Sequence, residues 1–311
     1  MKANRIHAFG GPEVILFEDV PRPTPAAGEV LVRVHAAGVG PWDAWVRAGR
    51  SAIPQPLPLT LGADLAGTVV TAGSSDSPFS AGAEVFGVTN PRFTGAYAQY
   101  ALASTQMLAH KPRRDFLESA AVPVVAVTAR QMLFREARVR AGDRVLVQGA
   151  AGNVGAYAVQ FAHMAGAHVI ASVVPRDKDE ALRLGADEAI SIPSEEAQGL
   201  WGTLDAAIDT VGGDTQRELF AYLRKGGTLV SSVSEPDTRL SQQYGIEARF
   251  ILVDVNTEDL KAVADFLDAQ AFVVRIGQVL PLGDARRAHE MLDGLRPLPP
   301  GKVVLDAMSG S

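Results

Sequence analysis

Gly149, Gly152 and Gly155 are the first residues with a chemically meaningful spacing, because they stand three apart in the stretch GAAGNVG. The apolar run RVLVQ precedes this stretch, and the amphipathic segment AYAVQFAHMAG follows it. A strand that turns into a helix through small residues lets the backbone approach a pyrophosphate. The G-x-G-x-x-G pattern is imperfect, since Ala150 stands at its first glycine. The strand before and the helix after nevertheless predict a dinucleotide-binding turn rather than an ordinary connection.

The end of the next strand, in ASVVPRDKD, indicates which dinucleotide to expect. A carboxylate there binds the ribose hydroxyls of NAD, whereas a nearby cation accommodates the 2′-phosphate of NADP. Residues 172–174 contain no acid, and Arg176 and Lys178 follow at once. We therefore expect NADPH. Asp177 weakens the local positive charge, and the alternative is that both cations belong to the solvated start of a helix.

Several other chemistries lack the residues they need. Cysteine is absent from all 311 residues, which excludes disulfides, cysteine nucleophiles and thiolate metal sites. The sequence contains no G-x-S-x-G elbow and no H-E-x-x-H pair. The dipeptide Gly301-Lys302 lacks the rest of a phosphate-binding loop. The six histidines are scattered, so we expect no metal site.

The elements that must position the turn alternate between strand and helix from residue 144 to about residue 233. This order predicts a parallel, doubly wound α/β sheet. Residues 1–120 instead contain short alternating strands separated by glycine and proline, which is typical of an antiparallel, partly closed β-domain. A helix is expected at TEDLKAVADFLDAQ, and strand-like segments return at RIGQVLPL and GKVVLDA. We therefore expect the end of the chain to complete the first domain.

Composition and charge restrict the classes of function. Hydrophobic residues make up 47% of the chain and charged residues 21%, which is typical of a globular protein. The 29 basic residues against 35 acidic ones leave a net charge of −6, which argues against a nucleic-acid partner bound through a strong basic field. The N-terminus has no apolar signal core, and no apolar run approaches the roughly 18 residues of a membrane span. A cytoplasmic protein is the expectation.

Seven segments, taken together, carry a resemblance to a known family. They are GVGPWDAWVRAG, LGADLAG, GAYAQYA, GDRVLVQGAAGNVG, LGAD, DTVGG and GKVVL, in this order along the chain. The sequence resembles the medium-chain dehydrogenase/reductase superfamily, and within it the zinc-free quinone oxidoreductase (zeta-crystallin-like) branch. The resemblance implies a GroES-like β-domain over residues 1–121, completed by 257–311, and a Rossmann domain over residues 122–256. It also implies a homodimer that binds NADPH.

The motifs and the resemblance together give a set of candidate site residues. The expected cofactor-binding residues are Thr128, Ala151, Gly152, Asn153, Val154, Gly155, Ser172, Arg176, Val211 and Phe250. The expected substrate pocket consists of Gly40, Pro41, Trp42 and Asp43, and neither a catalytic residue nor a metal ligand is assigned.

The substrate loop departs from the family motif, which usually reads GVNPVD. Gly40 replaces the asparagine, and a tyrosine that usually follows shortly after the R-x-G is missing from RAGRSAIP. Trp42 and Trp45 either offer a flat apolar wall to a hydrophobic substrate or pack as core. Asp43 is expected to hold the loop by hydrogen bonds.

The expected activity is hydride transfer from NADPH to a quinone or an activated alkene. The cofactor supplies the reducing chemistry in such a reaction, and the protein contributes mostly positioning. One alternative is an enoyl-thioester reductase of the same fold. The other is a dinucleotide-binding sensor or nucleic-acid-binding protein without significant catalysis, which the two lost polar positions keep open.

Overall fold

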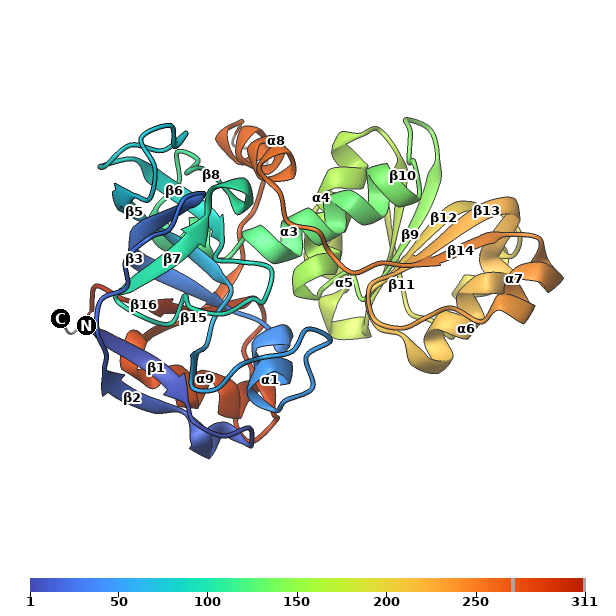
Figure 1. Ribbon diagram of the computed structural model, residues 1–311. Coiled ribbons are helices and arrows are strands. Elements are labelled where there is room, and N and C mark those ends of the chain that lie inside the picture. The colour runs from blue at the N-terminus through green and yellow to red at the C-terminus, as the bar shows by residue number, and fades with distance from the viewer. Residues whose placement is uncertain (270–271, 310–311) are drawn as a thin grey trace. The chain divides into compact units, whose positions relative to one another are not determined.

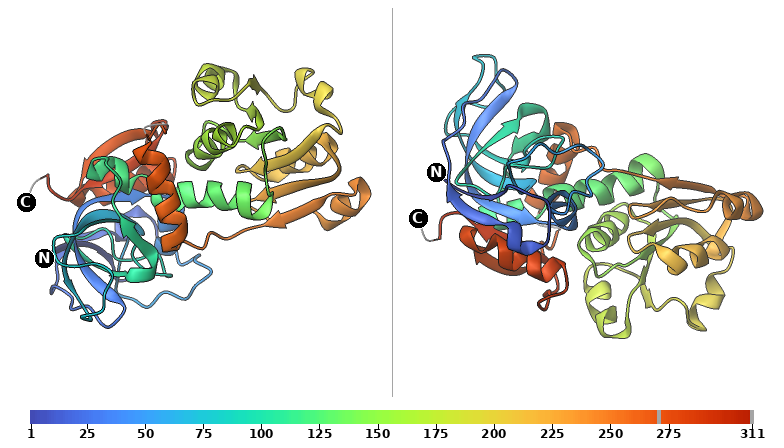
Figure 2. Two further views of the ribbon diagram at one scale, coloured as in Figure 1. Left: turned by 90° about the horizontal axis from the view of Figure 1, so that it is seen from above. Right: turned by 60° about the horizontal axis from the view of Figure 1, so that its bottom comes forward.

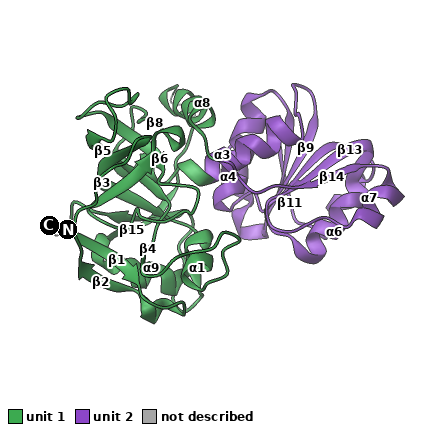
Figure 3. Ribbon diagram, viewed as in Figure 1, with its two compact units in different colours: residues 1–124, 255–311 green, residues 125–254 purple. Residues whose placement is uncertain are grey.

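The computed structural model describes residues 1–269 and 272–309, which form two compact units (Figure 3). Unit 1 consists of Met1–Val124 and Val255–Ser311, and unit 2 consists of Val125–Asp254. The helix expected at TEDLKAVADFLDAQ is present as α8 (Thr257–Asp268), while its last residue, Gln270, lies outside the described residues.

Unit 1 is built on strands that lie mostly antiparallel, in the described order β15-β16-β3-β5-β6-β8 with β7 also paired to β3 (Figure 1). These strands are β3 (Glu29–Val39), β5 (Asp64–Ala72), β6 (Glu84–Val88), β7 (Tyr100–Ser104), β8 (Leu108–His110), β15 (Ile276–Pro281) and β16 (Lys302–Asp306). A smaller sheet has the order β2-β1-β4, from β1 (Lys2–Ile6), β2 (Leu16–Asp19) and β4 (Leu59–Thr60). Because β16 pairs antiparallel with β3, the end of the chain contributes a strand to the same sheet as the N-terminal segment.

The helices of unit 1 lie between or after these strands, and all of those named next except the 12-residue α8 are eight residues long or shorter. They are α1 (Pro41–Arg47), α2 (Phe116–Ala120), α8 and α9 (Ala285–Leu292). Helix α3 (Pro123–Arg130) begins in unit 1, runs into unit 2 and continues there as a π-helical turn (Gln131–Glu136). A single hydrophobic core joins the sheet to α9, with Val32, Leu65 and Val303 among its fully buried side chains.

Unit 2 is the predicted parallel, doubly wound sheet. Its described strand order is β11-β10-β9-β12-β13-β14, and every pair in that order is parallel. The strands are β9 (Arg144–Gln148), β10 (His168–Ser172), β11 (Glu188–Ile190), β12 (Leu204–Asp209), β13 (Leu223–Ser231) and β14 (Glu247–Phe250). The central residues 145–147 are wholly buried, which explains why this strand is a continuous apolar run.

Helices cover both faces of the sheet of unit 2 (Figure 2). They are α4 (Asn153–Met164), α5 (Lys178–Arg183), α6 (Gly213–Tyr222) and α7 (Thr238–Tyr244). The chain proceeds from β9 outward to β11 and then crosses back to β12 on the other side of β9. The carboxyl ends of β9 and β12 therefore form the topological switch point, where ligands of such sheets bind.

Candidate active site

The turn between β9 and α4 depends on two glycines for different reasons. Gly149 has a φ of +75°, and a Cβ there would lie 2.7 Å from Cγ2 of Val211. Gly155 lies within α4, and its Cβ would lie 2.8 Å from Cα of Ala150 and would also collide with the Gly149 carbonyl oxygen. Gly149 therefore supplies the sharp turn, one position before the place where the standard motif has its first glycine. Gly155 allows the helix to cross the strand closely.

The start of α4 is open to an anion. Gly152 is its N-cap and has no side chain to accept from the first-turn N–H groups. The Gly152 N–H itself donates to the Gly149 carbonyl over 2.8 Å, which holds the turn closed. The first-turn N–H groups of a helix are unsatisfied by the helix itself and carry its positive dipole end. This backbone arrangement fits the pyrophosphate of a dinucleotide.

Four buried polar side chains form a row across the carboxyl ends of neighbouring strands. Ser172 of β10 pairs in register with Gln148 of β9, Gln148 with Asp209 of β12, and Asp209 with Ser231 of β13. Of these four residues, only Ser172 was predicted from the sequence as a cofactor-binding residue. Each of the others closes or nearly closes an apolar strand, as in RVLVQ, LDAAID and TLVSS, and that signal could have identified them.

Asp209 organises the loop that follows β12. Its Oδ2 accepts hydrogen bonds from Ser231 Oγ at 2.7 Å and Gln216 Nε2 at 2.9 Å. Its Oδ1 accepts from the backbone N–H groups of Val211 at 3.0 Å and Gly212 at 2.9 Å. A buried carboxylate with four donors is stably held, so the half-exposed Val211 is presented at a fixed position beside the turn.

Gln148 leaves one acceptor unused at the same edge. Its side chain is buried, and its Oε1 has no hydrogen-bond partner within the described part of the chain. A buried acceptor without a partner costs free energy unless a ligand or water donates to it. A ribose hydroxyl is such a donor, so this edge of the sheet also fits a dinucleotide.

The remaining predicted cofactor residues take different positions in unit 2. The carbonyl of the buried Ser172 accepts from the Gly149 N–H at 3.1 Å, so this residue holds the turn through its backbone. The Arg176 side chain is 87% exposed, and its Nε lies 3.9 Å from Oδ1 of Asp177. Thr128 is buried on α3, and Phe250 is half-buried at the end of β14. Arg176 therefore keeps a solvent-accessible guanidinium close after β10.

Two departures of the substrate loop from the family motif GVNPVD are coupled. They are Gly40 in place of the asparagine and Trp42 in place of the valine. The Gly40 N–H donates to Oδ2 of Asp43 at 2.8 Å, and this carboxylate oxygen also accepts from the Tyr97 hydroxyl at 2.9 Å. A Cβ at residue 40 would collide with the indole ring of Trp42. Asp43 thus ties the start of α1 to the sheet, and the indole occupies the space that a side chain at residue 40 would need.

A cluster of charged side chains lies beneath this loop. Lys302 Nζ forms an ion pair with Oδ2 of Asp64 at 3.0 Å, and both residues are buried. The same ammonium lies 4.3 Å from the ring centre of Trp42. Burial raises the pKa of Asp43 to about 7, against the hydrogen bond from Gly40 and the charge of Lys302. Burial also raises the pKa of Asp64, against its ion pair with Lys302.

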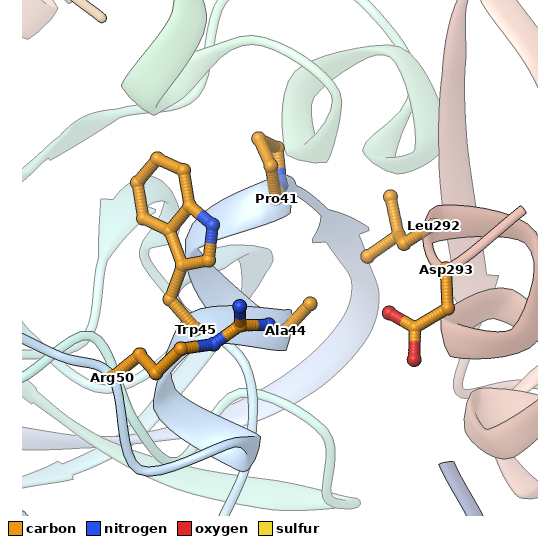
Figure 4. A pocket seen from close by; sticks show the side chains of 6 residues that line it. All are labelled: Pro41, Ala44, Trp45, Arg50, Leu292 and Asp293. Carbon is orange, nitrogen blue, oxygen red and sulfur yellow. The ribbon is translucent and has the colours of Figure 1, made fainter. Parts of the chain in front are cut away.

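An open pocket of about 360 Å³ lies beside the substrate loop and within unit 1 (Figure 4). Its lining residues are Pro41, Ala44, Trp45, Arg50, Leu292 and Asp293. Of the four predicted substrate residues only Pro41 lines this pocket, while Trp42 packs against Lys302 and Phe93. Trp45 is the indole that reaches the pocket, with 51% of its surface exposed.

The residues present do not fit a zinc site. Such sites use cysteine, histidine or carboxylate ligands grouped around the metal. The chain has no cysteine, and residues 1–269 and 272–309 contain no group of three or more histidine, aspartate or glutamate side chains that could hold a metal. Across the same residues no helix is long and apolar enough to cross a membrane.

Comparison with known proteins places the chain in a family. Residues 26–113 match the alcohol dehydrogenase GroES-like domain, and residues 184–305 match a family described as zinc-binding dehydrogenase. The quinone oxidoreductase of Sus scrofa is 33% identical over 309 residues, which cover 93% of each chain. The chain therefore belongs to the medium-chain dehydrogenase/reductase superfamily, in its quinone oxidoreductase branch.

Two further similarities support the same assignment. The human quinone oxidoreductase is 37% identical over 194 residues, which are 61% of this chain and 58% of the human protein. The structure of a quinone oxidoreductase from Coxiella burnetii superimposes with a TM-score of 0.89 at 30% identity, and the match covers 99% of each chain. The predicted fold, a GroES-like domain with a Rossmann-like domain, is confirmed. The description "zinc-binding" is that of the matched family.

Proposed function

We propose that the protein is an NADPH-dependent oxidoreductase that reduces quinones or activated alkenes without zinc. The observation that carries the proposal is the glycine turn at the switch point of the parallel sheet, with the uncapped start of α4 and the unused acceptor of Gln148 beside it. The relatives named quinone oxidoreductase support the choice of acceptor.

The chain's own residues act by binding and positioning. When bound, NADPH supplies the hydride. The backbone of residues 149–155 would hold its pyrophosphate, Gln148 would accept from a ribose hydroxyl, and Asp209 would keep the loop at Val211 in place. Fixing two reactants in one geometry removes much of the entropic barrier to their reaction.

The preference for NADPH rests on the residues after β10. No carboxylate stands at residues 172–174 to bind the ribose hydroxyls of NAD. Lys178 is engaged in an ion pair with Glu196 at 3.0 Å, whereas Arg176 keeps an exposed guanidinium. Arg176 is therefore the side chain we assign to the 2′-phosphate.

Zinc independence rests on the chemistry of the donor set. Without cysteine the chain cannot build a thiolate zinc site, and its described histidines and carboxylates form no cluster that could replace one. Treatment of the purified protein with a chelator should leave its activity unchanged.

The test of the proposal is turnover with both reduced nicotinamides. Purified protein is mixed with NADPH or NADH and a panel of quinones and enones, and the loss of reduced-nicotinamide absorbance is followed. We expect oxidation of NADPH, and we expect Arg176→Gln to raise the KM for NADPH about tenfold while changing the KM for NADH little. No turnover with any acceptor would contradict the proposed function, and equal effects on both cofactors would contradict the role of Arg176.

We also propose that residues 1–121 with 257–311 form the substrate domain, that residues 122–256 bind the dinucleotide, and that the protein is a homodimer. In support of the dimer, β14 ends the described strand order of unit 2 and exposes an edge that can pair with another strand. Size-exclusion chromatography with light scattering distinguishes a dimer from a monomer. A cytoplasmic location stays a prediction from the sequence.

A further inference from the structure

The pocket beside α1 has an aromatic and aliphatic wall together with charged groups (Figure 4). Pro41, Trp45 and Arg50 come from α1 and the turn after it, and Leu292 and Asp293 come from the end of α9 on the opposite side. About half of the surface of Trp45 is exposed, although contact between an apolar ring and water is unfavourable. The indole of Trp45 therefore offers one flat apolar face to a small molecule, in a pocket whose lining is otherwise largely polar.

Asp293 contributes no net negative charge, because a buried arginine already neutralises it. Nη2 of Arg47 lies 2.6 Å from Oδ2 of Asp293, and Arg47 itself is 2% exposed. Nη1 of Arg47 lies 3.0 Å from Nδ1 of His289, and its Nε donates to the Gly10 carbonyl at 3.1 Å. Every hydrogen of this guanidinium is a donor, so Nδ1 of His289 accepts and carries no proton.

His289 adds no charge either. Its burial and the neighbouring charge of Arg47 lower its pKa to about 3, so the imidazole is neutral at physiological pH. The group formed by Arg47, Asp293 and His289 therefore has no net charge.

Arg50 is the charge that remains. Its side chain is exposed, and no carboxylate of residues 1–269 or 272–309 forms an ion pair with it. Its guanidinium and the indole of Trp45 lie on the same side of the pocket (Figure 4). A guanidinium binds a carboxylate through two parallel hydrogen bonds, which makes it selective for planar acid groups.

We propose that this pocket binds the acid group of the substrate, with Arg50 as the residue that determines specificity. The substrate class is a planar unsaturated carbonyl compound that carries one ionised carboxylate or sulfonate, whose conjugated part lies against Trp45. The inference rests on the proposed function, because Pro41 of the expected substrate loop lines the same pocket.

The experiment compares two enones that differ by one acid group. The neutral compound is 4-phenylbut-3-en-2-one, and its partner carries a carboxylate at the para position of the ring. The ratio of kcat/KM for the acid to kcat/KM for the neutral ketone is measured with NADPH. In the unmodified protein we expect the acid to be preferred, and we expect the preference to weaken between low salt and about 0.5 M sodium chloride.

Variants of Arg50 test whether this residue causes the preference for the acid over the neutral ketone. Arg50→Gln should lower the ratio about tenfold, since a hydrogen-bonded contact between ions typically contributes this much. Arg50→Lys should retain part of the preference, because an ammonium keeps the charge and loses the paired geometry. Arg33→Gln is the matched control, because Arg33 is an exposed arginine of unit 1 whose Nη2 lies 3.9 Å from the sulfur of Met308. This control should leave the ratio unchanged.

Binding measured by calorimetry separates this inference from the proposed function. If no acceptor is turned over, but the acid binds more tightly than the ketone and Arg50→Gln removes the difference, the function fails and the inference holds. If the ketone and the acid are reduced and bound equally well, the inference is overturned while the function holds. Failure of the acid to bind the unmodified protein also overturns the inference.

Discussion

Replacement of Asp43 by asparagine should change how the stability of unit 1 depends on pH. Asp43 is fully buried, and its Oδ2 accepts from the Gly40 N–H and the Tyr97 hydroxyl. Burial raises its pKa from the usual 3.8 to about 7, and the Gly40 hydrogen bond and the charge of Lys302 offset this only in part. The folded protein therefore favours the protonated carboxyl at pH values where the unfolded chain has already lost that proton.

The sign and the size of the effect follow from this difference. Between pH 4 and pH 7 the unfolded state binds fewer protons than the folded state, so the contribution of Asp43 to the free energy of unfolding falls as pH rises. A difference of about three pKa units corresponds to a loss of about 4 kcal/mol over this interval, as an upper value. Asparagine carries no charge, and its amide oxygen can accept the same two hydrogen bonds, so the loss should vanish in Asp43→Asn.

The assay is urea unfolding of both proteins at several pH values from 4 to 8. Trp42 and Trp45 lie in unit 1 and Trp201 in unit 2, so a Trp201→Phe background restricts the tryptophan fluorescence to unit 1. The measured quantity is the free energy of unfolding of the variant minus that of the unmodified protein. We expect this difference to rise with pH by up to about 4 kcal/mol.

An exposed carboxylate provides a control of opposite sign. The hydrogen bond from Lys2 lowers the pKa of Asp19, so Asp19 stabilises the folded state as pH rises, and Asp19→Asn should lose that gain. The reasoning is refuted if the difference for Asp43→Asn stays flat from pH 4 to pH 8, because Asp43 would then ionise in the folded protein as it does in the unfolded chain.

Three other substitutions test the remaining geometry. Gly155→Ala should weaken NADPH binding at least about tenfold in a fluorescence titration, because an added methyl forces α4 away from the turn. Gly199→Ala is the control and should leave NADPH binding unchanged, because a methyl added at residue 199 has no neighbouring atom within 4 Å. Gly40→Asn should destabilise unit 1 by about 1–3 kcal/mol in urea unfolding, and the added change Trp42→Val should recover most of that loss. Lys302→Met should destabilise by about 3–5 kcal/mol, because it leaves a buried carboxylate unpaired; a loss below about 1 kcal/mol would contradict this.

The architecture of unit 2 was predictable because the signals are local. Strand and helix patterns alternate along the chain, and a parallel sheet with a known switch point follows from that order. The position of Gly149 was harder to interpret, since the side chains that a Cβ there would meet, Thr210 and Val211, lie in the loop after β12. The polar row at the carboxyl edge was missed apart from Ser172, although Gln148 and Asp209 each end an apolar run.

The charged groups of unit 1 could not be predicted because their partners are far apart in sequence. Asp64 and Lys302 are separated by 238 residues, and Arg47 and Asp293 by 246. A sequence shows the charge of each residue but not its distance from another charge. Arg47 and Arg50 stand three positions apart, yet Asp293 neutralises Arg47 while no carboxylate among the described residues (1–269 and 272–309) pairs with Arg50. Only the fold shows this difference.

The positions of the side chains explain why residue 40 is glycine and not the asparagine of the family motif. In the sequence alone, Gly40 means that the polar asparagine of the family motif is missing, which is consistent with a non-catalytic role. In the structure the Trp42 indole occupies the space beside residue 40, so the glycine and the tryptophan form one coupled change. The same indole covers the Lys302 ammonium, which joins the change to the buried charge cluster. The loop therefore keeps an ordered start of α1, held by the hydrogen bonds of Asp43, although the family asparagine is absent.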